Sequence, residues 1–146
     1  MKQMIKKILC PYDGTASSEF AFKNILTIAK NLKAEIFVLT CIRDKTTLGF
    51  FKLNSDRKLM TRQKKNAEKK IERLQKQAEK LGVSIKSKIV NCEIISKKII
   101  EQAKKEEVDT IAMSKTKRGT AAEKMYSQST VEMVFKESPC SFIHLK

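Results

Sequence analysis

The chain has 146 residues, 41% of them hydrophobic and 32% charged, and no apolar run approaches the roughly 18 residues that a membrane-spanning helix needs. This length and balance fit one globular domain with its own core and argue against a disordered or disulfide-stabilised chain. The first residues lead into a strand rather than a signal peptide, and four cysteines without C-x-x-C spacing fit a reducing compartment. We therefore expect a cytoplasmic protein.

The formal net charge of +15 comes almost entirely from lysine. Basic surfaces bind nucleic-acid backbones, but base recognition favours arginine, and single strands also need aromatic side chains on which bases stack. Here the lysines are spread over every predicted helix. A solvated lysine-rich surface is the preferred interpretation, and a nucleic-acid-binding accessory protein stays an alternative.

Apolar periodicity predicts strands that alternate with helices along the chain. Residues 5–10 form the first strand, and a helix over 17–32 follows, which Thr15 or Ser17 can cap. The remaining elements are a strand over 34–42, an irregular segment over 43–59 that contains Phe50-Phe51, a helix over 60–81, a strand over 83–90, a helix over 94–103, a strand over 108–113, a polar loop over 114–128, a helix over 129–136 and a strand over 140–145.

This alternation predicts the fold class: α/β, a single-domain doubly wound parallel sheet of five strands with helices on both faces, in the order 3-2-1-4-5. The domain spans residues 1–146. Charged residues alternate along 83–90, which is typical of an edge strand. Ligands in such sheets bind at the carboxyl ends of the strands where the order reverses, here between the first and fourth strands.

The first strand brings Pro11, Tyr12 and Asp13 to this crevice. The Asp13 carboxylate either accepts hydrogen bonds from a ribose or a base, or caps its own turn before Gly14. Both interpretations stay open on the sequence.

The fourth strand brings Met113 and Ser114, followed by the basic loop 115–120. Its cations and hydroxyls can hold phosphates beside the opening of a helix. The run Ser129-Thr130-Val131-Glu132 predicts a capping box with Ser129 at the cap, which is either satisfied by its own Glu132 or open to an anion.

The sequence offers no nucleophile paired with a base, so we expect no enzyme, or at most slow ATP hydrolysis. His144 is the single histidine and lies in the last strand, where a structural or interface role is favoured. Cys10, Cys41 and Cys92 fall near the carboxyl ends of the first three strands and could cluster there. Packing is favoured for them over metal or redox use, and no metal site is predicted.

Three segments resemble the universal stress protein family and together cover essentially the full chain. Ile8-Leu9-Cys10-Pro11-Tyr12-Asp13-Gly14-Thr15 is similar to the family's strand and P-x-D-G-S turn, and Val108-Asp109-Thr110-Ile111-Ala112-Met113 is similar to its A-D-L-I-V-M strand. Residues 129–134 and 138–143 resemble its closing S-V-x-E-x-V and A-P-C-P-V segments. The resemblance implies a flavodoxin-like domain that acts in the stress response and usually dimerises, often by antiparallel pairing of the last strand.

The resemblance also implies two branches, one of which binds ATP through the pattern G-x2-G-x9-G-S/T after the fourth strand. In this chain Ser114 and Lys117 stand at the first two glycine positions, and Gln128 stands at the third after a one-residue insertion before it. Of the family's pattern, only the final Ser/Thr position is matched, by Ser129. Side chains at these positions keep backbone N–H groups away from phosphates. We therefore predict a degenerate nucleotide-binding loop with weak or lost ATP binding.

The alternative is a sensor that binds ATP, with Mg²⁺, or another adenine nucleotide. Asp13 is retained, Cys41 stands where the family has a small apolar residue near the adenine, and Lys115 and its basic neighbours can hold an anion by charge. The candidate nucleotide-binding residues are Pro11, Tyr12, Asp13, Cys41, Met113, Ser114, Lys117, Arg118, Gln128, Ser129 and Thr130. The candidate dimer-interface residues are Phe142, Ile143, His144 and Leu145.

Overall fold

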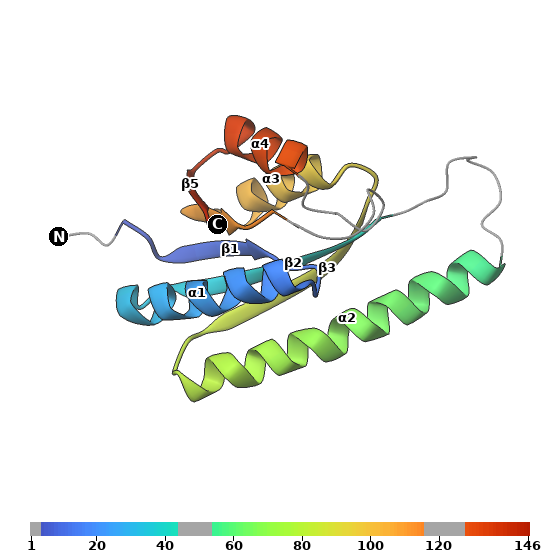
Figure 1. The fold of residues 1–146 in the computed structure, drawn as a ribbon, viewed down its shortest axis with the longest axis horizontal. Helices are drawn as coiled ribbons and strands as arrows, with labels where there is room; N and C mark the ends of the chain where they lie inside the picture. The colour runs from blue at the N-terminus through green and yellow to red at the C-terminus, as the bar shows by residue number, and fades with distance from the viewer. Residues whose placement is uncertain (1–3, 44–53, 116–127) are drawn as a thin grey trace.

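The computed structural model describes residues 4–43, 54–115 and 128–146. They form one five-stranded parallel sheet in the predicted order, β3-β2-β1-β4-β5. The elements are β1 (Lys7–Pro11), α1 (Ala16–Leu32), β2 (Glu35–Arg43), α2 (Asn54–Lys80), β3 (Ile85–Cys92), α3 (Ile95–Lys105), β4 (Thr110–Met113), α4 (Gln128–Glu137) and β5 (Ser141–His144). Helices α1 and α2 cover one face of the sheet, and α3 and α4 cover the other (Figure 1).

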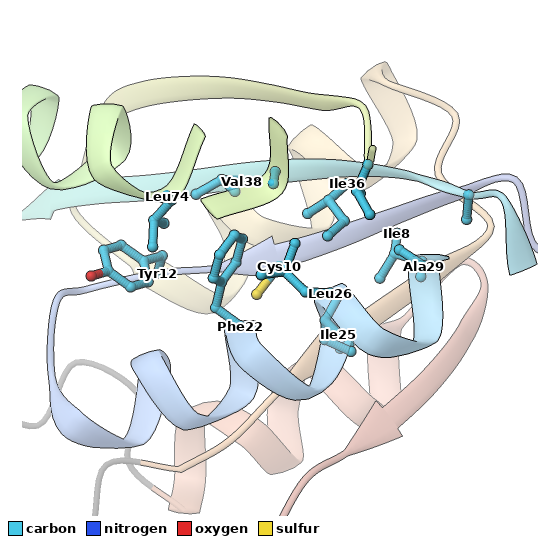
Figure 2. Packing of buried hydrophobic residues seen from close by; sticks show 14 residues of the cluster. Ile8, Cys10, Tyr12, Phe22, Ile25, Leu26, Ala29, Ile36, Val38 and Leu74 are labelled. Carbon is cyan, nitrogen blue, oxygen red and sulfur yellow. The ribbon is translucent and has the colours of Figure 1, made fainter. Parts of the chain in front are cut away.

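The central strands are apolar throughout because both of their faces are buried. In β1, Ile8 and Cys10 pack with α1 and α2, whereas Leu9 packs with α3 and α4. Figure 2 shows the first of these two cores, in which Phe22 of α1 and Leu74 of α2 meet the strands. The alternation of faces along each strand therefore decides which side chains reach which helix layer.

A carboxylate fixes β1 beside β4 at the start of both strands. Asp109 Oδ2 accepts hydrogen bonds from the backbone N–H groups of Lys6, at 2.8 Å, and Lys7, at 2.9 Å. The Lys7 ammonium in turn donates to the carbonyl of Glu106 at 3.1 Å. These bonds hold the register of the two strands whose carboxyl ends border the predicted crevice.

The largest departure from the predicted elements is the start of α2. The helix begins at Asn54, so the prediction of an irregular segment over 43–59 is wrong for residues 54–59. These residues have no apolar stripe, and this end of α2 extends beyond the sheet, which explains the missing periodicity (Figure 1). The pair Phe50-Phe51 lies outside the described residues. No helix of the described segments is long and apolar enough to cross a membrane.

Candidate functional site

The turn between β1 and α1 is held by the side chains of Asp13 and Thr15. Asp13 Oδ1 accepts from the Thr15 backbone N–H at 2.9 Å and from the Thr15 hydroxyl at 2.5 Å. Thr15 is the N-cap of α1, and its hydroxyl accepts from the Ser18 N–H at 3.3 Å. Gly14 permits the bend with a φ of +80°. Of the two predicted roles of Asp13, the structure therefore contains the turn cap.

Tyr12 points into the layer between the sheet and α1 and α2 (Figure 2). Its ring meets Phe22 edge to face, with 6.5 Å between ring centroids. Its hydroxyl donates to the Glu19 carboxylate, which also accepts from Arg73 of α2. Burial and then the bond to Glu19 raise the pKa of Tyr12, so the hydroxyl stays protonated at neutral pH. Glu19 of α1 thus connects Tyr12 to Arg73 of α2 beside the candidate site.

A cavity of about 290 Å³ lies at the carboxyl ends of β1 and β2, against α2, which is close to the lower limit of ligand-sized pockets. It includes three of the predicted residues, namely Tyr12, Asp13 and Cys41, together with side chains that the sequence did not single out. Among the described residues, the lining is Tyr12, Asp13, Thr40, Cys41, Ile42, Arg43, Gln63, Asn66, Ala67 and Lys70. We call it the β2–α2 cavity.

Thr40 is the unusual member of this lining. It is only 8% exposed, and its hydroxyl has no hydrogen-bond partner in the described part of the chain. A buried hydroxyl without a partner costs about 1–3 kcal/mol. Thr40 is the one hydroxyl residue in an otherwise apolar strand centre, a sequence signal that could have found it, whereas nothing in the sequence shows which α2 residues face the cavity.

The predicted residues from the other side of the sheet lie elsewhere. Met113 and Ser114 are buried at the end of β4. Gln128 and Lys115 line a second hollow with three residues of the carboxyl terminus, which are His144, Leu145 and Lys146. We call it the α4–β5 hollow.

The strand order places the β2–α2 cavity on one side of the junction of β1 and β4 and the α4–β5 hollow on the other. The crevice predicted at this junction stays a prediction. Pro11 ends β1 and is buried. Lys117 and Arg118 lie outside the described residues.

The predicted capping box is wrong. Helix α4 begins at Gln128, so Ser129 lies inside its first turn instead of before it, and Thr130 follows, half-buried. Glu132 accepts a hydrogen bond from Gln128 Nε2 at 2.8 Å rather than serving a cap at Ser129. A glutamine and a glutamate four residues apart lie on the same helix face, which favours this pairing.

The three cysteines that could cluster divide between the two cores. Cys10 faces α1 and α2, and its burial raises the pKa of its thiol to about 12. Cys41 and Cys92 share the other core, and a hydrogen bond between their thiols raises the pKa of Cys41 and lowers that of Cys92. Among the described residues, no three His, Cys, Asp or Glu side chains come together as a metal site.

A sequence model of the universal stress protein family matches residues 4–146. The chain belongs to that family. A universal stress protein of Methanocaldococcus jannaschii is 27% identical over 145 residues, which are 99% of this chain and 84% of the relative. A solved universal stress protein of Lactobacillus plantarum is 20% identical with a TM-score of 0.81, covering 97% of this chain and 98% of that one. A family protein of Arabidopsis thaliana, solved with AMP bound, is 15% identical with a TM-score of 0.69, covering 97% and 91%.

The last strand of this universal stress protein forms one edge of the sheet. Within the described segments, β5 pairs with β4 alone. Phe142 and Ile143 are half-buried and His144 is exposed, so the edge presents both apolar surface and the histidine. Phe135 of α4 is 63% exposed and meets Phe142 edge to face, with 5.6 Å between ring centroids. Such an exposed edge with apolar neighbours favours pairing with another strand.

Proposed function

We propose that this universal stress protein binds the nucleoside end of an adenine nucleotide in the β2–α2 cavity, holds a triphosphate poorly, and acts through partner contacts rather than turnover. The observation that carries the proposal is the contrast between an intact cavity beside Asp13 and Cys41 and a phosphate loop without its glycines. The relative from Arabidopsis thaliana with AMP bound supports the choice of ligand class.

The substituted glycine positions explain why the triphosphate is held poorly. Ser114 is 3% exposed, so a buried side chain takes the place of the first glycine of the pattern. Gln128, at the third position, starts α4 and holds the Glu132 carboxylate near the amino end of the helix. A carboxylate there offsets the positive end of the helix dipole and repels phosphate.

Turnover is not part of the proposal, because the reactive groups of the cavity are occupied or inert. Asp13 is engaged in the hydrogen bonds of its turn, which leaves it a poor general base. The raised pKa of Cys41 keeps its thiol protonated, and a protonated thiol is a weak nucleophile. Binding without chemistry is therefore the favoured activity.

The proposal includes a homodimer joined along β5. The exposed edge and the apolar pair Phe135 and Phe142 supply backbone hydrogen-bonding groups and contact area for a second copy. We expect a dimeric mass in light scattering coupled to size-exclusion chromatography. A monomeric mass at micromolar concentration would contradict this part of the proposal and leave nucleotide binding untouched.

Thermal-shift titration with adenosine, AMP, ADP and ATP, each with and without Mg²⁺, tests the ligand. A ligand that binds only the native state raises the melting temperature. We expect adenosine and AMP to raise it, and ATP to raise it no further than AMP. A larger shift with ATP than with AMP would show that the triphosphate is held after all, and no shift with any of the four would sink nucleotide binding.

The matched control restores the family's glycines. In the triple variant Ser114→Gly, Lys117→Gly and Gln128→Gly, backbone N–H groups regain access to phosphates, so the ATP response should rise relative to the AMP response. An unchanged ratio would show that the substituted glycines do not limit triphosphate binding.

A further inference from the structure

A buried hydroxyl in β2 has no partner and lines the β2–α2 cavity. Strand alternation places Thr40 on the same face as Val38, toward α1 and α2, whereas Leu39 and Cys41 face the other helix layer. Thr40 is only 8% exposed, and its hydroxyl has no hydrogen-bond partner in the described segments. A valine has the same shape without this unsatisfied group, so the hydroxyl is explained best by a group that enters the cavity.

Among the described residues, the lining of the same cavity carries more positive than negative charge. Lys70 of α2 and Arg43 at the end of β2 are the cations of this described lining, and Asp13 is its carboxylate. Asp13 Oδ1 already accepts two hydrogen bonds from Thr15. The side-chain amides of Gln63 and Asn66 complete a polar wall on α2. Such a lining suits a ligand that carries both hydrogen-bonding groups and negative charge.

The Lys70 side chain packs over the turn between β1 and α1. A Cβ built on Gly14 would collide with Lys70 Nζ and would lie 2.9 Å from its Cδ. The lysine side chain therefore lies over Gly14, directly after Asp13, at the carboxyl end of β1. This is the end of the strand at which phosphates are bound in doubly wound sheets.

We propose that Thr40 and Lys70 form a ligand-contact pair on the α2 side of the nucleotide, in which the Thr40 hydroxyl bonds a polar group of the nucleoside and the Lys70 ammonium holds a single phosphate. The inference rests on the proposed nucleotide function and adds to it a second source of phosphate binding. The phosphate is held by side-chain charge from α2 instead of backbone N–H groups after β4. Phosphate binding of this kind weakens as salt rises, because exposed charges are screened.

The test pairs each variant with a control of the same chemistry. Thr40→Val is matched by Thr110→Val, because the Thr110 hydroxyl is also buried without a partner among the described residues but lines neither of the two hollows. Lys70→Gln is matched by Lys69→Gln, its exposed neighbour on α2, which does not line the cavity. Isothermal titration with AMP and with adenosine measures affinity, and melting temperature without ligand checks that each variant folds.

We expect Thr40→Val to weaken both AMP and adenosine by about two- to tenfold, the range of one neutral hydrogen bond. Lys70→Gln should weaken AMP about tenfold and leave adenosine unchanged, because only AMP carries the phosphate. The two control variants should bind both ligands as the unchanged protein does.

Each failure has its own meaning. If the unchanged protein binds AMP and either test variant behaves like its control, the contact assigned to that residue is wrong while nucleotide binding stands. If Lys70→Gln weakens adenosine as much as AMP, the lysine does not hold a phosphate. If the unchanged protein binds neither ligand, the nucleotide function and the contact pair both fall.

Discussion

The two hollows that flank the junction of β1 and β4 differ in how they are built. The lining of the β2–α2 cavity includes the fully buried Tyr12. Helix α2, which also borders this cavity, packs into the core through Leu74. The α4–β5 hollow is lined by Lys115, Gln128 and three residues of the carboxyl terminus, at the exposed edge of the sheet. Buried side chains therefore border the cavity in which we propose that a ligand binds, whereas the second hollow borders the edge at which we propose that another copy pairs.

The two proposed roles therefore lie on different sides of the sheet. In the proposal, the nucleoside binds beside the β1–α1 turn and α2, and a second copy pairs along β5. Because the two hollows share no lining residue among those that the structure describes, we expect that changes on one side need not disturb the other.

The largest effect is expected from Leu74→Ala. Leu74 is fully buried between α2 and the sheet, so its truncation should lower the free energy of unfolding by about 2–5 kcal/mol. Because it seats α2 beside Tyr12, the increase in melting temperature caused by AMP should shrink as well. Denaturant unfolding measures the first quantity, and thermal shift with and without AMP measures the second.

Val134→Ala is the control from the other side. Val134 is fully buried on the face of α4 that packs against the sheet. Its truncation removes fewer atoms than Leu74→Ala and should therefore lower the free energy of unfolding by less. Its response to AMP should equal that of the unchanged protein. If both truncations reduce the response equally, the two sides are coupled through the sheet and the independence argued here is wrong.

A smaller effect is expected from Gly14→Ala. Both Gly14, at φ +80°, and Gly82, at φ +70°, adopt a left-handed conformation, which costs other residues about 1–2 kcal/mol. The Cβ of an alanine at position 14 would also displace the Lys70 side chain. A Cβ at position 82 would meet no atom within 4 Å. Both variants should therefore lose similar stability in denaturant unfolding, but Gly14→Ala alone should bind AMP more weakly in titration. Equal AMP affinity in the two variants would show that the position of Lys70 does not matter.

The sequence predicted the architecture well because buried parallel strands are nearly continuous apolar runs that alternate with helices. Apart from the start of α2, the predicted boundaries agree with the structure to within two residues. Asp13 was predicted from the turn between the first strand and its helix, Cys41 was predicted from the family resemblance, and both line the cavity. Thr40 was missed although it is the one hydroxyl in an apolar strand centre. Lys70 was missed because a surface helix with a narrow apolar stripe does not reveal how it lies over the sheet.

At the start of α4, the sequence pattern predicted a capping box that the structure does not contain. Ser129 and Glu132 have the spacing of a capping box, but Gln128 extends the helix by one residue and bonds Glu132 itself. A pattern of residue types cannot distinguish these two arrangements, because both put a carboxylate near the same helix end. The register of a cap is decided by one residue, and only the structure shows it.

The smallest effect concerns the thiols and compares the two cores of the sheet. The bond from Cys41, together with the charges of Arg43 and Lys98, lowers the pKa of Cys92, whereas burial raises the pKa of Cys10 to about 12. A thiolate is the reactive form, so Cys92 should be alkylated with a midpoint at lower pH than an ordinary cysteine thiol, and Cys10 should stay unmodified in the folded protein. Peptide mass spectrometry after iodoacetamide treatment across a pH series measures the midpoints.

The charge of Lys98 provides the internal control for this comparison. Lys98→Gln should raise the alkylation midpoint of Cys92, because it removes a charge that favours the thiolate. Lys97→Gln should leave the midpoint in place, since Lys97 lines the same surface hollow as Cys92 but is not among the groups that shift its pKa. Equal midpoints in both variants would mean that the charge of Lys98 does not contribute to the acidity of Cys92. A Cys92 midpoint above that of an ordinary cysteine thiol would instead show that burial outweighs every group that stabilises the thiolate.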